Sequence, residues 1–196
     1  MASCLVGSEM CIRDRDIKSY LCVGIDVNAK ALGSDNFEDL KTHSKKIIDA
    51  TRDIALAFKP NFAFFERWGS KGFKWLEETV DYIGSDCIII ADAKRGDIGN
   101  TAGQYAESIF DHFGFDAVTL NPFMGEDSIN PFLVHENKGV FILCRTSNSS
   151  AHIFQNQKLN GGLFLYEKVA EWANNLNHKN NIGLVVGATV PQELSR

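Results

Sequence analysis

The sequence has 196 residues, of which 44% are hydrophobic, so the chain is long enough to bury one sizeable core. Its 20 Lys and Arg against 25 Asp and Glu give a net charge of -5, and there is no basic run. The charge pattern therefore gives no sign of a nucleic-acid-binding surface. The five cysteines form no C-x-x-C pair, and no apolar stretch approaches the ~18 residues of a membrane span. We therefore predict a cytoplasmic protein with buried free thiols, whose partners are small molecules or a second copy of itself.

Short apolar runs alternate along the chain with stretches that have helical spacing. The apolar runs, rich in β-branched and aromatic residues, predict six strands, at residues 20–26, 58–66, 87–93, 116–121, 139–145 and 182–189. The stretches between them predict helices, at residues 37–57, 70–84, 101–114 and 162–176. Continuous apolar runs suit strands covered on both faces, so a parallel sheet is expected.

Regular alternation of strands and helices leaves two architectures open, the doubly wound sheet and the (β/α)₈ barrel. The turn after the first strand, at residues 24–33, lacks the G-x-G-x-x-G pattern, which weakens the dinucleotide-binding form of the open sheet. A barrel needs eight βα units in roughly 250 residues, and six are recognisable here. Residues 1–16 follow neither period, and their string LVGSEMCIRDR resembles a translated sequencing adapter, so we interpret them as an artefactual leader.

The segment at residues 91–102, ADAKRGDIGNTA, carries the strongest chemical signal. An apolar strand ends there in alternating charges, and residues i and i+2 of a strand point to the same side, so Asp92 and Lys94 are expected to meet. Opposite charges about 4 Å apart attract by ~4 kcal/mol at an effective dielectric near 20, which favours an ammonium that can donate a proton. The alternative is an ordinary surface ion pair at the start of a loop, which contributes little.

Eleven contiguous residues of this segment resemble the signature D-x-K-x-x-D-I-G-N-T of the orotidine 5'-phosphate decarboxylases. The second predicted strand, F-K-P-N-F-A-F-F-E, is similar to the form seen in the bacterial type 2 branch of that family. The resemblance implies an α/β fold, a TIM (β/α)₈ barrel with about six of its eight units in residues 17–196. It also implies a catalytic array of Lys59, Asp92, Lys94 and Asp97, with Asp97 supplied by the other subunit of a homodimer.

The same resemblance assigns substrate-binding roles to four further residues. Asp26 matches the aspartate that holds ribose hydroxyls, and Thr101 matches a threonine that reaches across the dimer interface. Ser147 matches the serine that contacts the pyrimidine, with Thr146 as its near neighbour. Without the family, each has an ordinary explanation: Asp26, Thr146 and Ser147 as turn formers, Thr101 as a helix cap and Lys59 as an edge lysine.

The activity implied is conversion of orotidine 5'-monophosphate (OMP) to UMP and CO₂ in pyrimidine synthesis, without a cofactor, with Lys94 as the proton donor. No H-x-x-x-H or carboxylate cluster has metal-ligand spacing, so no metal is predicted. In the family the phosphate is held by a P-G-I-G-A-Q-G-G-like loop after the seventh strand and an arginine after the eighth. Because neither occurs in this sequence, we expect the 196-residue chain to be nearly inactive and poorly stable.

Two alternatives remain open. The Mg²⁺-dependent sister barrels, keto-gulonate-phosphate decarboxylase and hexulose-phosphate synthase, share D-x-K-x-x-D, but the I-G-N-T continuation and Lys59 argue against them. The other alternative is a non-catalytic fragment that keeps the dimer surface without a working phosphate site.

Overall fold

Parallel strands in simple sequential order form the sheet of this protein. The computed structural model describes residues 19–189, and within them the strand order is β1-β2-β3-β4-β5-β6. The strands are β1 (Cys22–Ile25), β2 (Ala57–Pro60), β3 (Ile88–Arg95), β4 (Ala117–Leu120), β5 (Gly139–Arg145) and β6 (Ile182–Val186). Each is parallel to its neighbour.

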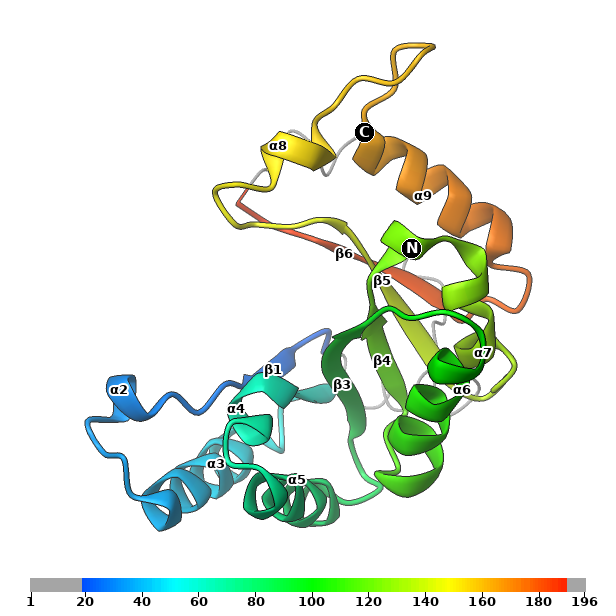
Figure 1. The fold of residues 1–196 in the computed structure, drawn as a ribbon. Coiled ribbons are helices and arrows are strands. Elements are labelled where there is room, and N and C mark those ends of the chain that lie inside the picture. The colour runs from blue at the N-terminus through cyan, green and yellow to red at the C-terminus, as the bar shows by residue number, and fades with distance from the viewer. Residues whose placement is uncertain (1–18, 190–196) are drawn as a thin grey trace.

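Helices connect the strands, and most of them lie along one side of the curved sheet (Figure 1). They are α2 (Ala29–Leu32), α3 (Phe37–Thr51), α4 (Phe62–Glu66), α5 (Ser70–Ile83), α6 (Gly99–Glu107), α7 (Asn130–Leu133), α8 (His152–Gln155) and α9 (Leu165–Leu176), with a π-helical turn η1 (Ser108–His112) and 3₁₀ turns η2 (Pro122–Met124) and η3 (Glu126–Ser128). A doubly wound sheet reverses its strand order and is covered on both faces, whereas this sheet does neither. The prediction of a partial barrel is confirmed.

The strand predicted at residues 58–66 is wrong in its second half. β2 ends at Pro60, which has no backbone N–H to continue the ladder, and the Asn61 side chain accepts a hydrogen bond from Ala63 N at the start of α4. The run of aromatic residues that follows is therefore a helical turn, in which Phe62 and Phe65 point into the core three residues apart. This turn places Asn61 at the carboxyl end of β2.

The other predicted helices are present with shifted ends. The helix expected at 37–57 stops at Thr51, and the helix expected at 101–114 begins at Gly99 and passes into the π-helical turn η1. Within residues 19–189, no helix combines the length and the apolar character that crossing a membrane requires. The leader predicted at 1–16 and the end of the chain from residue 190 lie outside the described residues.

Alternate residues of the strands face two different environments. The outward set packs under the helices in the main core, which contains Phe58, Ile89, Ala91, Val118, Leu120, Val140 and Ile142. The inward set forms a separate apolar layer of Ala57, Ile88, Ile90 and Ala117, against which Leu56 and Phe141 pack. The next inward positions toward the carboxyl ends of β2, β3 and β4 are therefore Lys59, Asp92 and Thr119, two residues beyond this layer.

The cysteine prediction holds for two of the thiols. Cys87 and Cys144 are free and buried, and the Cys144 thiol donates a hydrogen bond to the backbone oxygen of Tyr166. Burial raises the pKa of Cys144 to about 11, so this thiol is inert at neutral pH. Cys22 is exposed, contrary to expectation; its strand β1 lies at the edge of the sheet in the described part of the chain.

Candidate active site

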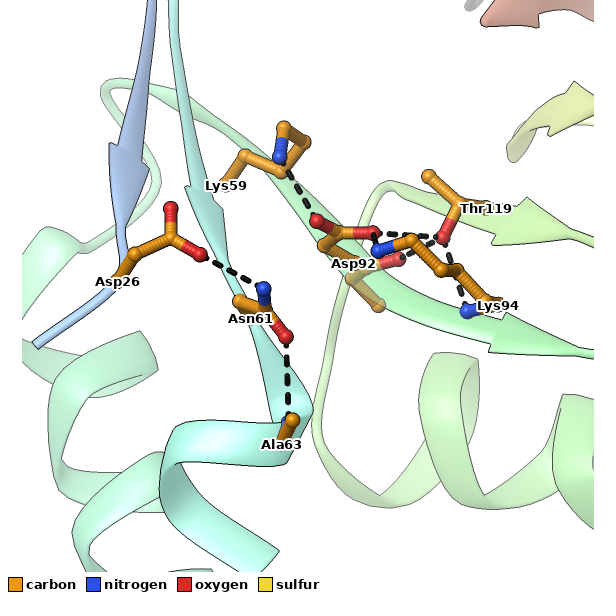
Figure 2. A network of polar contacts seen from close by, with 8 residues as sticks. Asp26, Lys59, Asn61, Ala63, Asp92, Lys94 and Thr119 are labelled. Carbon is orange, nitrogen blue, oxygen red and sulfur yellow. Dashed lines mark hydrogen bonds and ion pairs between the residues drawn. The ribbon is translucent and has the colours of Figure 1, made fainter. Parts of the chain in front are cut away.

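Charged and polar side chains gather where β1 to β4 end, on the inward face of the sheet (Figure 2). Asp92 lies at their centre and is only 8% exposed. Its Oδ2 atom is 2.9 Å from Lys59 Nζ, and its Oδ1 atom is 2.5 Å from Lys94 Nζ. One carboxylate therefore bridges two ammonium groups, so the array carries one net positive charge above an apolar layer.

The electrostatics keep the bridging carboxylate charged. Burial is the largest influence on Asp92 and by itself raises the pKa, but the hydrogen bonds from Lys94 and Lys59, together with their positive charges, outweigh it. The net effect lowers the pKa of Asp92 below its ordinary value. Asp92 thus acts as a fixed anion that orients both lysines.

A bulge in β3 sets the position of Lys94. Ala91 pairs with Val118 and Arg95 pairs with Leu120, so β3 advances four residues while β4 advances two. Within the bulge, Lys94 has a φ of 48°, a left-handed conformation that costs a non-glycine residue on the order of 1–3 kcal/mol. The sequence predicted that Lys94 and Asp92 would meet, which they do, but the bulge and not regular alternation brings them together.

Thr119, which sequence reasoning missed, ties the bulge to the carboxylate. Its buried hydroxyl accepts a hydrogen bond from the backbone N–H of Lys94 (3.0 Å) and donates to Asp92 Oδ1 (3.1 Å). The same side chain thus fixes both the backbone of the lysine and the carboxylate that binds its ammonium (Figure 2). A small polar residue near the end of the fourth strand was the only available signal in the sequence.

Asn61 is a second residue that the sequence did not single out. Its amide donates to Asp26 Oδ1 at 2.7 Å, while its own oxygen accepts from Ala63 N at 3.2 Å. Asn61, just after β2, also lies opposite Asp92 of β3 in an isolated parallel bridge. Asp26, exposed just beyond β1, is therefore held by a residue whose backbone bridges to that of Asp92, and Figure 2 shows the Asp26–Asn61 contact beside the charged array.

Asp97 and Thr101 lie apart from this array within the described chain. The Asp97 carboxylate accepts a hydrogen bond from the Ile98 amide at 2.8 Å, directly before α6 begins. Thr101 is exposed in the first turn of α6. The structure thus brings together Lys59, Asp92 and Lys94, but not Asp97.

Thr146 and Ser147 follow β5, at the base of the segment 146–164 that projects from the sheet with α8 (Figure 1). The Thr146 hydroxyl donates to Asn148 Oδ1 (2.7 Å) and accepts from Gln155 Nε2 (2.9 Å), so it is engaged within the loop. Ser147 is exposed, and a Cβ at Gly187 would lie 2.9 Å from its Cβ. Of the two, Ser147 is therefore the residue available to a ligand, and Gly187 permits the close approach of β6.

Asp92 is expected to stabilise the fold to an extent that depends on pH. Because the pKa of Asp92 is lowered in the folded protein, its charged form stabilises the fold above the ordinary aspartate range, and this contribution is lost as the pH falls through the lowered pKa. Urea unfolding should therefore show wild type more stable than Asp92→Asn near pH 7, with the difference shrinking toward about pH 3. A difference that stays constant over this range would contradict the lowered pKa.

Among the described residues, no group of three or more His, Cys, Asp or Glu side chains is arranged to hold a metal ion. The chemistry that the array offers lies in its own charges. Two ammonium groups held by one carboxylate can stabilise negative charge that develops nearby, and an ammonium can deliver a proton to it.

Comparison with known proteins identifies the family to which this arrangement belongs. Residues 19–196 match the family model described as "Orotidine 5'-phosphate decarboxylase / HUMPS family". An orotidine 5'-phosphate decarboxylase from Natronomonas pharaonis is 47% identical over 187 residues, which are 93% of this chain and 68% of the relative. Another, from Dehalococcoides mccartyi, is 45% identical over 184 residues, 91% of this chain and 67% of the relative.

Solved structures agree with the sequence matches. The structure of Leishmania donovani OMP decarboxylase superposes with a TM-score of 0.87 at 39% identity, over 95% of this chain and 72% of that one. A structure described as a putative orotidine 5'-phosphate decarboxylase from Streptomyces avermitilis gives a TM-score of 0.86 at 33% identity, over 96% and 71%. The resemblance drawn from the segment at 91–102 is thus confirmed, and this chain belongs to the orotidine 5'-phosphate decarboxylase / HUMPS family.

Proposed function

We propose that this protein is an orotidine 5'-phosphate decarboxylase, which converts OMP to UMP and CO₂ in pyrimidine synthesis. The observation that carries the proposal is the bridging of Lys59 and Lys94 by the buried Asp92 at the carboxyl ends of β2 and β3. The ends of barrel strands are where enzymes of this fold place their catalytic groups. The relatives from Dehalococcoides mccartyi and Natronomonas pharaonis are both named orotidine 5'-phosphate decarboxylase.

The reaction needs stabilisation of negative charge on carbon. When the bond between C6 of the pyrimidine and its carboxylate breaks, the electron pair stays on C6 and CO₂ leaves. Charges held in place before the reaction stabilise such an anion without the cost of reorganising solvent. Asp92 and Thr119 hold Lys94 in this way, one through its ammonium and the other through its backbone.

Lys94 then supplies the proton. Its Nζ–H bond breaks, the C6 electron pair takes the proton to form UMP, and water returns a proton to the lysine. No step requires a redox partner or a metal-bound nucleophile. Lys94 is half-exposed and Lys59 is more buried, so Lys94 is the ammonium that a ligand above the array reaches more easily.

The remaining substrate contacts are assigned by position. Asp26, held by Asn61, is suited to accept hydrogen bonds from ribose hydroxyls, and the exposed Ser147 is suited to contact the pyrimidine. We also propose a homodimer in which Asp97 and Thr101 complete the site of the other subunit. The exposed apolar side chain of Ile98, next to Asp97 in the chain, supports a contact surface there.

The proposed location is the cytoplasm, where the reduced state of Cys87 and Cys144 is maintained. Cell fractionation followed by detection of the protein tests this point.

The decisive experiment follows the loss of OMP by its ultraviolet absorbance, with the 196-residue chain and with any longer product of its reading frame, each with and without EDTA. We expect turnover that EDTA does not change, and only slow turnover from the 196-residue chain, which spans 67% of its Dehalococcoides relative. Turnover abolished by EDTA would favour a Mg²⁺-dependent sister reaction. Tight binding of UMP without turnover in either form would favour a binding role.

A further inference from the structure

Arg95 follows the proton-donating lysine in the chain but points the other way, into the layer of helices. Its guanidinium carbon lies 5.2 Å from the centre of the Phe62 ring and 5.1 Å from the centre of the Tyr105 ring. Its Nη2 atom forms an ion pair with Glu66 Oε1. One side chain therefore joins the end of β3 to α4, through Phe62 and Glu66, and to α6, through Tyr105.

The backbone of Arg95 is also the point at which the β3 bulge ends. Pairing with β4 resumes at Arg95, opposite Leu120, and the Arg95 carbonyl accepts a hydrogen bond from Asn121 N at 2.7 Å. The residue just before it is Lys94, with its φ of 48°. A strained conformation of this kind persists only where the surrounding contacts fix it.

Different side chains contact the bulge on the inward and outward sides of the sheet. On the inward side, Thr119 and Asp92 bind the backbone and the ammonium of Lys94. On the outward side, the described structure offers the Arg95 side chain, which lies over the Phe62 and Tyr105 rings and is paired with Glu66. We infer that Arg95 is a positioning residue, which fixes the bulge from the helix side and thereby holds the Lys94 ammonium against Asp92.

The geometry requires arginine and not merely a positive charge. A planar guanidinium can stack on two rings and pair with a carboxylate at once, whereas a lysine ammonium is a single point of charge on a flexible stem. Arg95→Lys should therefore keep the ion pair with Glu66 but lose the contacts that the guanidinium makes with the Phe62 and Tyr105 rings. The inference rests on the proposed function, because it concerns the lysine to which the proton transfer is assigned.

The test reads the Lys94 side chain directly. In protein labelled with ¹³C at the lysine ε-carbons, an ammonium held beside Asp92 gives two separate ε-proton signals, which are assigned by their loss in Lys94→Arg. In the 196-residue chain, we expect Arg95→Met to merge the two signals and Glu66→Gln to bring them closer together. Arg95→Lys should fall between wild type and Arg95→Met.

A matched control separates positioning from general destabilisation. Arg52 is another partly buried arginine, which donates to the backbone oxygens of Ile83 (2.6 Å) and Tyr82 (2.7 Å) and lies over the Tyr82 ring, away from the charged array. Arg52→Met should leave the Lys94 signals unchanged. The inference is overturned if Arg95→Met leaves them unchanged or if Arg52→Met merges them equally. Should Arg95→Met fail to fold, unchanged signals in both Glu66→Gln and Arg95→Lys would overturn it.

Measurement of kcat and KM gives a second test, which depends on the proposed function. In whichever form of the chain turns over OMP, Arg95→Met should lower kcat on the order of 10- to 100-fold with little change in KM, because the proton donor is displaced while the binding groups remain. A rise in KM at unchanged kcat would overturn the positioning role. If no form turns over OMP, the proposed function fails, and the Lys94 signals still decide the role of Arg95.

Discussion

Lys94→Ala is expected to lower the turnover of OMP by at least about 10³-fold, because it removes both a general acid and one of the fixed charges of the site. The side chain contacts Asp92 and is half-exposed, so its loss should leave the fold intact. Decay of the OMP absorbance measures the rate, and thermal unfolding monitored by circular dichroism checks the fold. Lys74→Ala, which truncates an exposed lysine of α5, serves as the control and should retain wild-type turnover.

The same variant also tests whether the site is shared between subunits. If Asp97 completes the site of the partner, mixing Lys94→Ala with Asp97→Ala subunits regenerates native sites. Random pairing makes half of the dimers mixed, each with one intact site of two, so about a quarter of wild-type turnover should return. Near-normal turnover of Lys94→Ala alone would remove Lys94 as the proton donor, and mixtures that stay inactive would argue against a shared site.

Gly72→Ala is expected to destabilise the fold by about 3 kcal/mol or more, although alanine is the better helix former. Gly72 is buried in α5, where it faces the end of α4. An added Cβ would lie 1.8 Å from the carbonyl oxygen of Phe65 and 2.9 Å from Trp68 Cβ. Since the closest atom belongs to the backbone, the two helices would have to separate. Urea unfolding gives the measurement.

Gly103 in α6 offers a matched control for this substitution. It is also a helical glycine, but a Cβ there would meet no atom within 4 Å. Gly103→Ala should therefore be neutral or stabilising by up to about 1 kcal/mol. If both substitutions changed the free energy of unfolding alike, the close approach of α4 and α5 at Gly72 would not be a real constraint.

The alternation of strands and helices could be predicted from the sequence, because short apolar runs alternate with stretches that have helical spacing. These patterns alone could not decide between a barrel and an open sheet, since that depends on strand order and on which face the helices cover; the barrel was predicted from the family resemblance of residues 91–102. The prediction of a strand over 58–66 was wrong for a local reason. Pro60 ends β2 and Asn61 begins α4, although the aromatic run that follows favours a strand. The burial of Phe62 and Phe65 in the core favours the helical conformation of that segment.

The charged part of the site was largely predictable, whereas its support was not. Asp92 and Lys94 lie two residues apart at the end of one predicted strand, so their proximity could be predicted, although the bulge that brings them together could not. Thr119 lies in β4 and Asn61 directly follows β2, and their roles depend on a register that no single segment encodes. The bulge at Lys94 could not be predicted either. A left-handed backbone conformation is usually signalled by glycine or asparagine, and here the residue is a lysine.

The sequential order of the sheet has a consequence for how the chain assembles. Each strand pairs with the next one along the chain, so every pairing closes only the loop made by one intervening helical segment. Contacts of this kind can form as soon as the following strand leaves the ribosome, which lets β1 to β6 assemble in the order of their synthesis. In a barrel of this type, the contact with the greatest separation along the chain is the seam between its first and last strands. Closure of that seam is therefore expected to be the slowest step of folding and the period in which the growing sheet is most open to aggregation.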